Sequence, residues 1–204
     1  MRIEAFTASP DRAGRYKTVF SDGSVLRLYK QTVQDFGIFT GLELTEEEYQ
    51  SLLSAAAEMS AKMRAVRIVS ASNVSKRELE HRLVQKGEDA ASAKNAVSWM
   101  EEMDLLDDEK TAEMIVHRCA AKGYGIARAK QALYEKRIPK AYWESALENY
   151  PDQTEYIRTY IADHLPSQPD PKAVKKVIDA LLRKGHSYGD VRHVLQCGEE
   201  LEEY

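Results

Sequence analysis

Cysteine and long apolar runs are scarce in this chain, and their scarcity excludes several classes of protein. Only Cys119 and Cys197 occur in 204 residues, too few for a disulfide framework or for a zinc site of their own. No apolar stretch approaches the ~20 residues that a membrane-spanning helix needs. Residues 1–20 also lack the basic-then-apolar order of a signal peptide. We therefore expect a cytoplasmic protein that has no metal, no cofactor and no contact with a membrane.

A large excess of one charge is absent too. The chain has 29 Lys and Arg against 33 Asp and Glu, a formal net charge of −4, and this mild acidity argues against a histone-like coat on nucleic acid. Charged residues nevertheless make up 30% of the chain and apolar residues 43%. That composition is typical of a soluble protein with a buried core, and the length allows one or two ordinary domains.

The first 30 residues differ in pattern from the rest of the chain. Ile3, Ala5 and Thr7 alternate with polar neighbours, and β-prone residues flank Asp22-Gly23. An Asp-Gly pair between β-prone runs is typical of a hairpin turn. We predict a small β-hairpin or meander in this segment.

From about Thr45 onward the pattern is helical. A hydroxyl followed three residues later by a carboxylate marks helix starts at Thr45 and Ser75. A glycine directly after a basic residue marks helix ends at Gly87, Gly123 and Gly185. Apolar residues between the starts and ends have the spacing of helices with one buried face. We expect about nine helices from residue 60 onward, joined by short connections.

One short phrase recurs three times, as Leu83-Val-Gln-Lys86-Gly87, Leu133-Tyr-Glu-Lys136-Arg137 and Leu181-Leu-Arg-Lys184-Gly185. Its leucines are 50 and 48 residues apart, which indicates tandem repeats. We predict a mainly α fold: three tandem three-helix, helix-turn-helix-like repeats form an elongated array, preceded by the N-terminal β-hairpin. The expected segments are a hairpin segment (1–44), a linking helix (45–59), repeats over 60–104, 105–150 and 151–197, and an acidic tail (198–204). The long surface of such an array favours a large partner.

These repeats resemble the RecX family of bacterial regulators of the RecA recombinase. The matching motifs are Ser75-x-x-Glu78-Leu79-x-x-x-Leu83-x-x-Lys86-Gly87, Leu105-Leu-Asp107-Asp-Glu109, Lys122-Gly-Tyr-Gly125, Ile126-Ala-Arg-Ala-Lys-Gln-Ala-Leu133 and Leu181-Leu-Arg-Lys-Gly-His-Ser-Tyr188. Two positions depart from the family pattern, because Asp104 and Arg137 stand where glycines are usual. We expect a changed turn at Asp104 and a changed helix end at Arg137.

The resemblance implies a function as well as a fold. Proteins of this family bind the filament that RecA forms on single-stranded DNA and lie in its groove. There they inhibit its ATPase, strand-exchange and SOS coprotease activities, and they are not enzymes. We expect this chain to be a monomeric negative regulator of RecA, acting in homologous recombination and the SOS response. Direct contact with single- or double-stranded DNA is left open, since family members tend to be more basic than this chain.

Charge is segregated along the repeats. Residues 98–113 have seven acidic residues and one basic residue, whereas 114–143 have seven basic residues and one acidic residue. A second basic window covers 172–193. Basic windows are typical both of a phosphate- or acid-binding surface and of an ordinary solvated helix face, and the resemblance favours binding. The candidate partner-binding residues are Arg118, Lys122, Tyr124, Arg128, Lys130, Lys136, Arg137, Lys140, Arg183 and Lys184.

The sequence leaves other interpretations open beside partner binding. Tyr124 suits stacking on a base, but packing against a neighbour is the commoner role of tyrosine. The acidic cluster around Asp107 suits magnesium, but a helix cap at Asp107 explains it more simply. A sequence-tolerant DNA-binding module that acts without RecA is the chief alternative function. A nuclease would need a metal or acid–base set that the sequence does not show.

Overall fold

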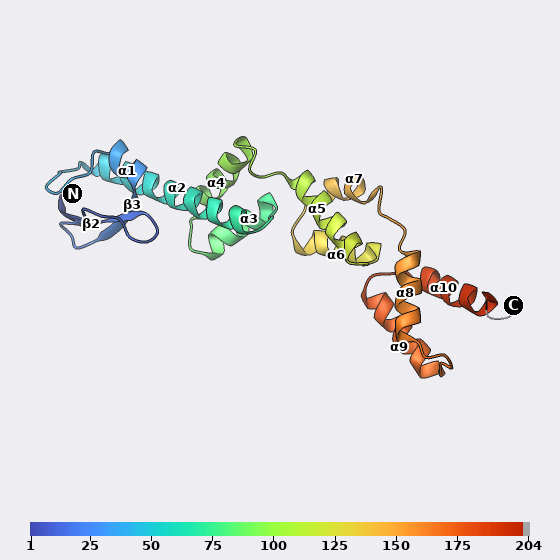
Figure 1. Cartoon of the computed structure of the whole chain (residues 1–204). Coiled ribbons are helices and arrows are strands. Elements are labelled where there is room, and N and C mark those ends of the chain that lie inside the picture. The colour runs from blue at the N-terminus through green and yellow to red at the C-terminus, as the bar shows by residue number, and fades with distance from the viewer. Residues whose placement is uncertain (202–204) are drawn as a thin grey trace. The chain divides into compact units, whose positions relative to one another are not determined.

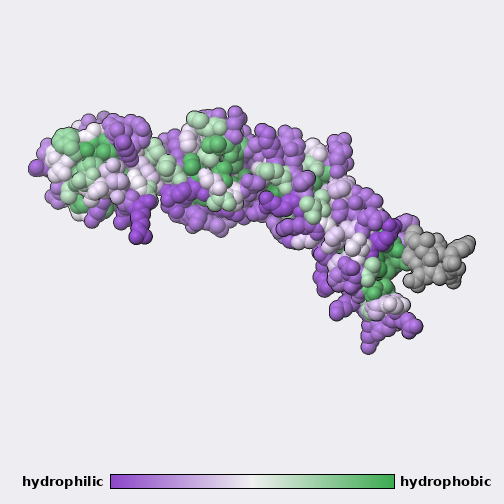
Figure 2. All heavy atoms as spheres, in the orientation of Figure 1, coloured by the Kyte–Doolittle hydropathy of each residue, from purple (hydrophilic) through white to green (hydrophobic). Residues whose placement is uncertain are grey.

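The computed structural model describes the backbone of residues 1–201 and the side chains of residues 1–196. The chain divides into two compact units, the first from Met1 to Leu106 and the second from Asp107 onward, and each is described by itself. On the face drawn in Figure 2, hydrophilic residues cover most of the surface, and hydrophobic residues occur in separate patches. Cys197 and the expected acidic tail (198–204) lie outside the described side chains.

The N-terminal unit begins with a three-stranded antiparallel sheet (Figure 1). Its strands are β1 (Ile3–Phe6), β2 (Arg15–Phe20) and β3 (Val25–Tyr29). The Asp22-Gly23 turn joins β2 to β3, with Gly23 at a φ of 80°. The predicted hairpin is therefore present, and β1 extends it to a meander. The short helix α1 (Lys30–Asp35) follows directly.

The long helix α2 (Glu46–Ala71) connects the sheet to the first helical repeat (Figure 1). It starts as expected, because Thr45 and Glu48 form a reciprocal capping box. Its first half contributes Leu52 to the core beneath the sheet, whereas its second half contributes Ala65 to the core of the first repeat. The expected boundary at residue 60 thus lies inside one continuous helix, since no glycine or proline interrupts 46–71.

The remaining helices form three groups. The first group also includes the end of α2. Their bounds are α3 (Lys76–Gln85), α4 (Ala90–Glu102), α5 (Asp108–Ala121), α6 (Ile126–Glu135), the 3-10 turn η1 (Lys140–Tyr142), α7 (Trp143–Leu147), α8 (Thr154–His164), α9 (Pro171–Arg183) and α10 (Tyr188–Leu201). Each group has its own apolar cluster. The repeated leucines Leu83, Leu133 and Leu181 are fully buried, one in each cluster. The prediction of a mainly α fold with three-helix repeats is confirmed.

The residues that end these helices adopt a positive φ angle even where they are not glycine. Gly87, Gly123 and Gly185 all have positive φ angles, as a helix-terminating residue requires. Asp104 and Arg137 both have a φ of 55°, which is the left-handed conformation that glycine adopts more easily. The expectation of a changed turn and a changed helix end is therefore wrong, because both residues keep the glycine geometry at the cost of backbone strain.

The second and third repeats, both in the C-terminal unit, are joined by a close approach of main chain to main chain. The Gly125 N–H donates to the Lys184 carbonyl at 3.0 Å, and the Ala127 N–H donates to the Gly185 carbonyl at 3.3 Å. A Cβ atom on Gly125 would lie 2.0 Å from the Gly185 oxygen, which no side chain can tolerate. We call this contact the glycine junction.

The left-handed strain at Arg137 predicts an unusual ranking of two variants. Arg137→Gly and Arg137→Ala both remove the side chain, but only glycine relieves the positive φ. After allowing for the greater freedom of glycine in the unfolded chain, we expect the glycine variant to be more stable by about 1 kcal/mol. Urea unfolding of both variants measures the difference, and equal stabilities would contradict the strain.

The glycine junction predicts that alanine destabilises the protein at Gly125 but not at Gly189. We expect Gly125→Ala to lower the free energy of unfolding by about 2–3 kcal/mol, because its methyl group overpacks two main-chain segments. Gly189→Ala is the matched control, since its Cβ would meet only the Ser187 hydroxyl at 3.6 Å. Alanine there should change stability by less than about 1 kcal/mol. Thermal unfolding with a similar shift for both variants would refute the junction.

Candidate partner-binding surface

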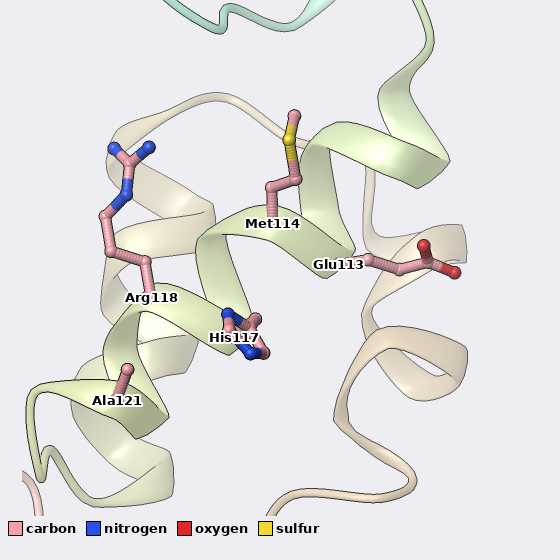
Figure 3. Close-up of a pocket in the computed structure, with 5 residues that line it drawn as sticks. All are labelled: Glu113, Met114, His117, Arg118 and Ala121. Carbon is pink, nitrogen blue, oxygen red and sulfur yellow. The ribbon is translucent and has the colours of Figure 1, made fainter.

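The outer face of α5 combines apolar and charged side chains. Ala112, Val116 and Cys119 face the core, which turns the opposite side of the helix to solvent. An open groove of about 430 Å³ on that side is lined by Glu113, Met114, His117, Arg118 and Ala121 (Figure 3). Arg118 and Met114 project from the same side of the helix in this view, whereas Glu113 points away from them. Methionine and arginine are enriched at protein interfaces.

The outer face of α6 presents an aromatic side chain one helical turn after a cation. Ala129 and Leu133 are fully buried, so Lys130 and Tyr134 occupy another side of the helix at i, i+4 spacing. Tyr134 is 73% exposed, and Lys130 is exposed as well. Arg137 is also exposed, but it lies beyond the end of α6 in the left-handed conformation. Sequence reasoning missed Tyr134. The signal was available, because a tyrosine directly after the core leucine falls outside the buried stripe.

Most of the predicted binding residues lie on the surface. The exposed ones are Arg118, Lys122, Lys130, Arg137, Lys140 and Arg183. Lys122 is the C-cap of α5, where a positive charge interacts favourably with the helix dipole. Lys122 and Lys130 have no ion-pair partner within the described part of the chain. No carboxylate of the described residues therefore neutralises the positive charge of these two lysines.

Arg128 and Lys136 do not form the simple pair that their spacing predicts. Arg128 is half-buried, and its guanidinium lies 3.2 Å from the Glu135 carboxylate. Lys136 ends α6 as its C-cap rather than lying within the helix. Part of the charge of Arg128 is thus neutralised inside the protein.

Tyr124 and Lys184 are engaged at the glycine junction. The Lys184 ammonium donates to the Tyr156 hydroxyl at 2.9 Å and lies 5.8 and 5.3 Å from the ring centroids of Tyr124 and Tyr160. The hydrogen bond that Lys184 donates to Tyr156 raises the pKa of Lys184, because it favours the charged ammonium. Tyr124 thus packs within the protein, as the commoner role of tyrosine predicts. Neither side chain is displayed as an independent binding group.

His186 is the buried titratable group of the same junction. It is 6% exposed, its Nε2 atom lies 3.0 Å from the Gly123 carbonyl oxygen, and its ring stacks on Tyr156. Burial lowers the pKa of His186, and the charge of Lys184 lowers it further, while the Gly123 hydrogen bond and Asp190 oppose the shift. The neutral imidazole is therefore the form that fits the junction.

The acidic cluster after α4 has a structural role. The Asp107 carboxylate accepts a hydrogen bond from the Lys110 N–H at 3.0 Å, so the predicted helix cap is confirmed. That hydrogen bond also lowers the pKa of Asp107. Among the described residues, no three His, Cys, Asp or Glu side chains are grouped to hold a metal ion. Burial raises the pKa of Cys119, which disfavours the reactive thiolate.

The helices of this surface are not membrane helices. None of those in the described part of the chain is long and apolar enough to cross a bilayer.

The buried histidine predicts an acid sensitivity of the fold. Below about pH 6.5, the ordinary pKa of histidine, the unfolded chain gains a proton that His186 in the folded state resists. Because the unfolded state then binds more protons, stability falls as the pH drops from 7.5 to 5.5. We expect His186→Gln, which keeps a hydrogen-bond donor but cannot titrate, to lose less stability over that range. Melting curves at several pH values measure this difference, and parallel losses in both proteins would contradict it.

Comparison with known proteins relates the whole chain to one family. The family model "RecX, second three-helix domain" matches residues 107–147, which contain α5, α6 and α7. The regulatory protein RecX of Clostridioides difficile is 25% identical, over 100% of this chain and 97% of that protein. The RecX protein of Chlorobaculum tepidum is 31% identical, over 67% of this chain and 88% of that protein.

Solved structures agree at the level of the fold. A crystal structure of regulatory protein RecX superposes with a TM-score of 0.67 at 18% identity, covering 96% of this chain and 98% of that chain. RecX from Lactobacillus salivarius superposes with a TM-score of 0.62 at 22% identity, covering 74% of this chain and 99% of that chain. Together with the identity to the Chlorobaculum tepidum protein over most of its length, these matches show that the chain belongs to the RecX family of regulatory proteins.

Proposed function

We propose that this RecX-family regulator binds the RecA filament on single-stranded DNA, in the filament groove, and restrains it. The bound protein inhibits ATP hydrolysis, strand exchange and the SOS coprotease activity. The observation that carries the proposal is the exposed positive charge of Lys122 and Lys130, which has no ion-pair partner among the described residues, in the repeat that matches the family model.

The chemistry of the surface supports a composite partner. A nucleoprotein filament offers both phosphates and protein side chains, and the second repeat presents groups for each. Exposed lysines suit phosphates or acidic side chains, whereas Met114 and Tyr134 suit a protein surface. Naked DNA alone would leave the apolar part of this surface without a partner.

Restraint of the filament follows from contacts that reach more than one RecA protomer. Successive repeats of one chain engage neighbouring protomers and favour one relative arrangement of them. ATP turnover must change that arrangement, so binding that prefers one state opposes the cycle. The protein acts in this scheme as a monomeric ligand of the filament and not as an enzyme.

The direct test is DNA-dependent ATP hydrolysis by RecA of the same organism, with this protein titrated in. Inhibition well below one copy per RecA supports filament binding, and it favours blocked growth or disassembly over competition for DNA. No inhibition at an excess over RecA refutes the proposal. In that case, tight and salt-sensitive binding to naked DNA would support the alternative of a DNA-binding module that acts without RecA.

Charge reversal on α5 and α6 predicts a selective loss of this inhibition. We expect Lys122→Glu with Lys130→Glu to raise the concentration for half-maximal inhibition about ten-fold or more, since two attractive contacts become repulsive. These positions are better than Arg128 and Lys136, because Arg128 already pairs with Glu135.

The matched control for that variant is Arg77→Glu with Lys94→Glu. Both control residues are exposed in the N-terminal unit, so the net charge changes equally while α5 and α6 stay intact. Circular dichroism of both double variants monitors folding. Equal inhibition by the native protein and the Lys122/Lys130 variant would remove this surface from the interface.

A further inference from the structure

A second cationic site lies in the N-terminal unit, outside the basic windows at 114–143 and 172–193. A groove of about 520 Å³ opens between the sheet, α2 and α3. Five of the side chains that line it are cationic: Arg15, Arg64, Arg67, Arg82 and Lys86. Acidic residues outnumber basic ones in this unit as a whole, so the groove is a local concentration of positive charge. We call it the arginine groove.

Two of its arginines are held from beneath by buried carboxylates. The Arg64 Nε atom donates to Glu88 at 2.5 Å, and the Arg82 Nε atom donates to Glu78 at 2.7 Å. The Glu88 and Glu78 side chains are 7% and 14% exposed, whereas the two arginines are 34% and 31% exposed. Each guanidinium is therefore fixed through Nε, and a terminal nitrogen of Arg82 also donates to the Ser72 hydroxyl at 3.4 Å. Both arginines remain partly exposed, and this fixation preorganises them for a ligand.

Two further cations of the groove lack an acidic partner. Arg67 donates from Nε to the Met63 carbonyl at 3.0 Å and from a terminal nitrogen to the Tyr29 hydroxyl at 2.7 Å, so neutral groups hold it in place. Lys86 is exposed at the end of α3 and has no ion pair within the described residues. Their charges are not neutralised inside the protein.

The positive charge continues from the groove onto the sheet. Arg15 pairs with Tyr29 across β2 and β3, and Lys17 pairs with Arg27. Residues opposite one another in antiparallel strands share a face, as do residues two apart along a strand. Lys17 and Arg27 therefore stand on the same face of the sheet as Arg15, and both are exposed. Arg15 is itself ion-paired with Asp11 at 2.9 Å, so Lys17 and Arg27 supply the uncompensated positive charge of this row.

We propose that the arginine groove binds the sugar-phosphate backbone of a nucleic acid strand, without regard to its base sequence. Fixed guanidinium groups match the paired oxygens of a phosphate, and a row of cations matches the regular charge spacing of a polyanion. Tyr29 is 7% exposed and its hydroxyl is occupied, so it offers no platform for stacking bases. The site stands independently of RecA, and it goes beyond the proposed function.

The test removes the two cations that have no acidic partner. Arg67→Gln with Lys86→Gln leaves every buried carboxylate of the groove paired. The full chain is titrated into fluorescein-labelled oligo-dT, and into a duplex of equal length, at several salt concentrations, with anisotropy as the readout. We expect binding about ten-fold weaker at 50 mM salt, and a salt slope lower by about 1.5, the value for two lost phosphate contacts. Tighter binding of the native protein to oligo-dT or to the duplex identifies whether the groove takes a single or a double strand.

The matched control is Arg77→Gln with Lys94→Gln, two exposed cations of the same unit outside the groove. It should bind like the native protein. Equal loss in both double variants would indicate general charge and would overturn the site. Native affinity in Arg67→Gln with Lys86→Gln would overturn it too. If poly-glutamate displaces the oligonucleotide at equal charge concentration, the groove belongs to an acidic protein segment and the nucleic-acid assignment is wrong.

The test of the arginine groove is separable from the test of the proposed function. The Arg67/Lys86 variant is tested without RecA, whereas the Lys122/Lys130 variant is tested by inhibition of ATP hydrolysis. Loss of oligonucleotide binding with no RecA inhibition by the native protein would keep the groove and refute the filament proposal. Inhibition of RecA by the native protein, together with unchanged oligonucleotide binding by the Arg67/Lys86 variant, would refute the groove alone.

Discussion

The approach of main chain to main chain at Gly125 and Gly185 is the contact on which the C-terminal unit depends. A three-helix repeat of fewer than 50 residues buries too little apolar surface to be firmly stable alone. Each repeat must therefore dock on a neighbour. Here the docking uses backbone hydrogen bonds at 3.0 and 3.3 Å, which require that no side chain intervene. The same contact places Lys184 among three tyrosine rings and buries His186. The positions of Lys184 and His186 could not be predicted from the sequence, because both depend on this contact.

Local features of the fold could be predicted from the sequence because they depend on residues close together in the chain. The capping box at Thr45, the cap at Asp107 and the buried leucines of the repeats all follow from spacings of a few residues. The extent of α2 could not be predicted. Its 26 residues serve two separate cores, and a boundary between cores leaves no mark on a helix that lacks glycine and proline. The alternation of Ile3, Ala5 and Thr7 predicted β1, whereas its pairing with β2 across a loop does not follow from that alternation.

The candidate surface could be predicted where its charged residues lie close together in the sequence. Lys122 and Lys130 belong to one basic window, and both are exposed. Tyr124 and Lys184 belong to basic windows too, but they are 60 residues apart in sequence and meet only through the fold. The arginine groove was not predicted, because its cations come from three separate elements, β2, α2 and α3. Residues 59–77 do hold five basic residues and no acidic one, but only Arg64 and Arg67 of them line the groove. Only the fold separates the buried carboxylates from the outward-facing guanidinium groups.

Two cationic sites of different build suit the proposed function, in which the protein distinguishes a filament from its components. The arginines of the groove are fixed by hydrogen bonds, whereas the lysines of α5 and α6 are long side chains that lose considerable entropy when bound. We expect each site alone to bind weakly in a protein with a net charge of −4, because the surrounding acids disfavour bulk polyanions. Linked on one chain, two weak sites gain avidity only on a target that presents both of their ligands at a reachable distance. A nucleoprotein filament presents phosphates and protein side chains together, and naked DNA and free protein do not. Specificity for the assembled filament then arises from the linkage, and neither site needs high affinity of its own.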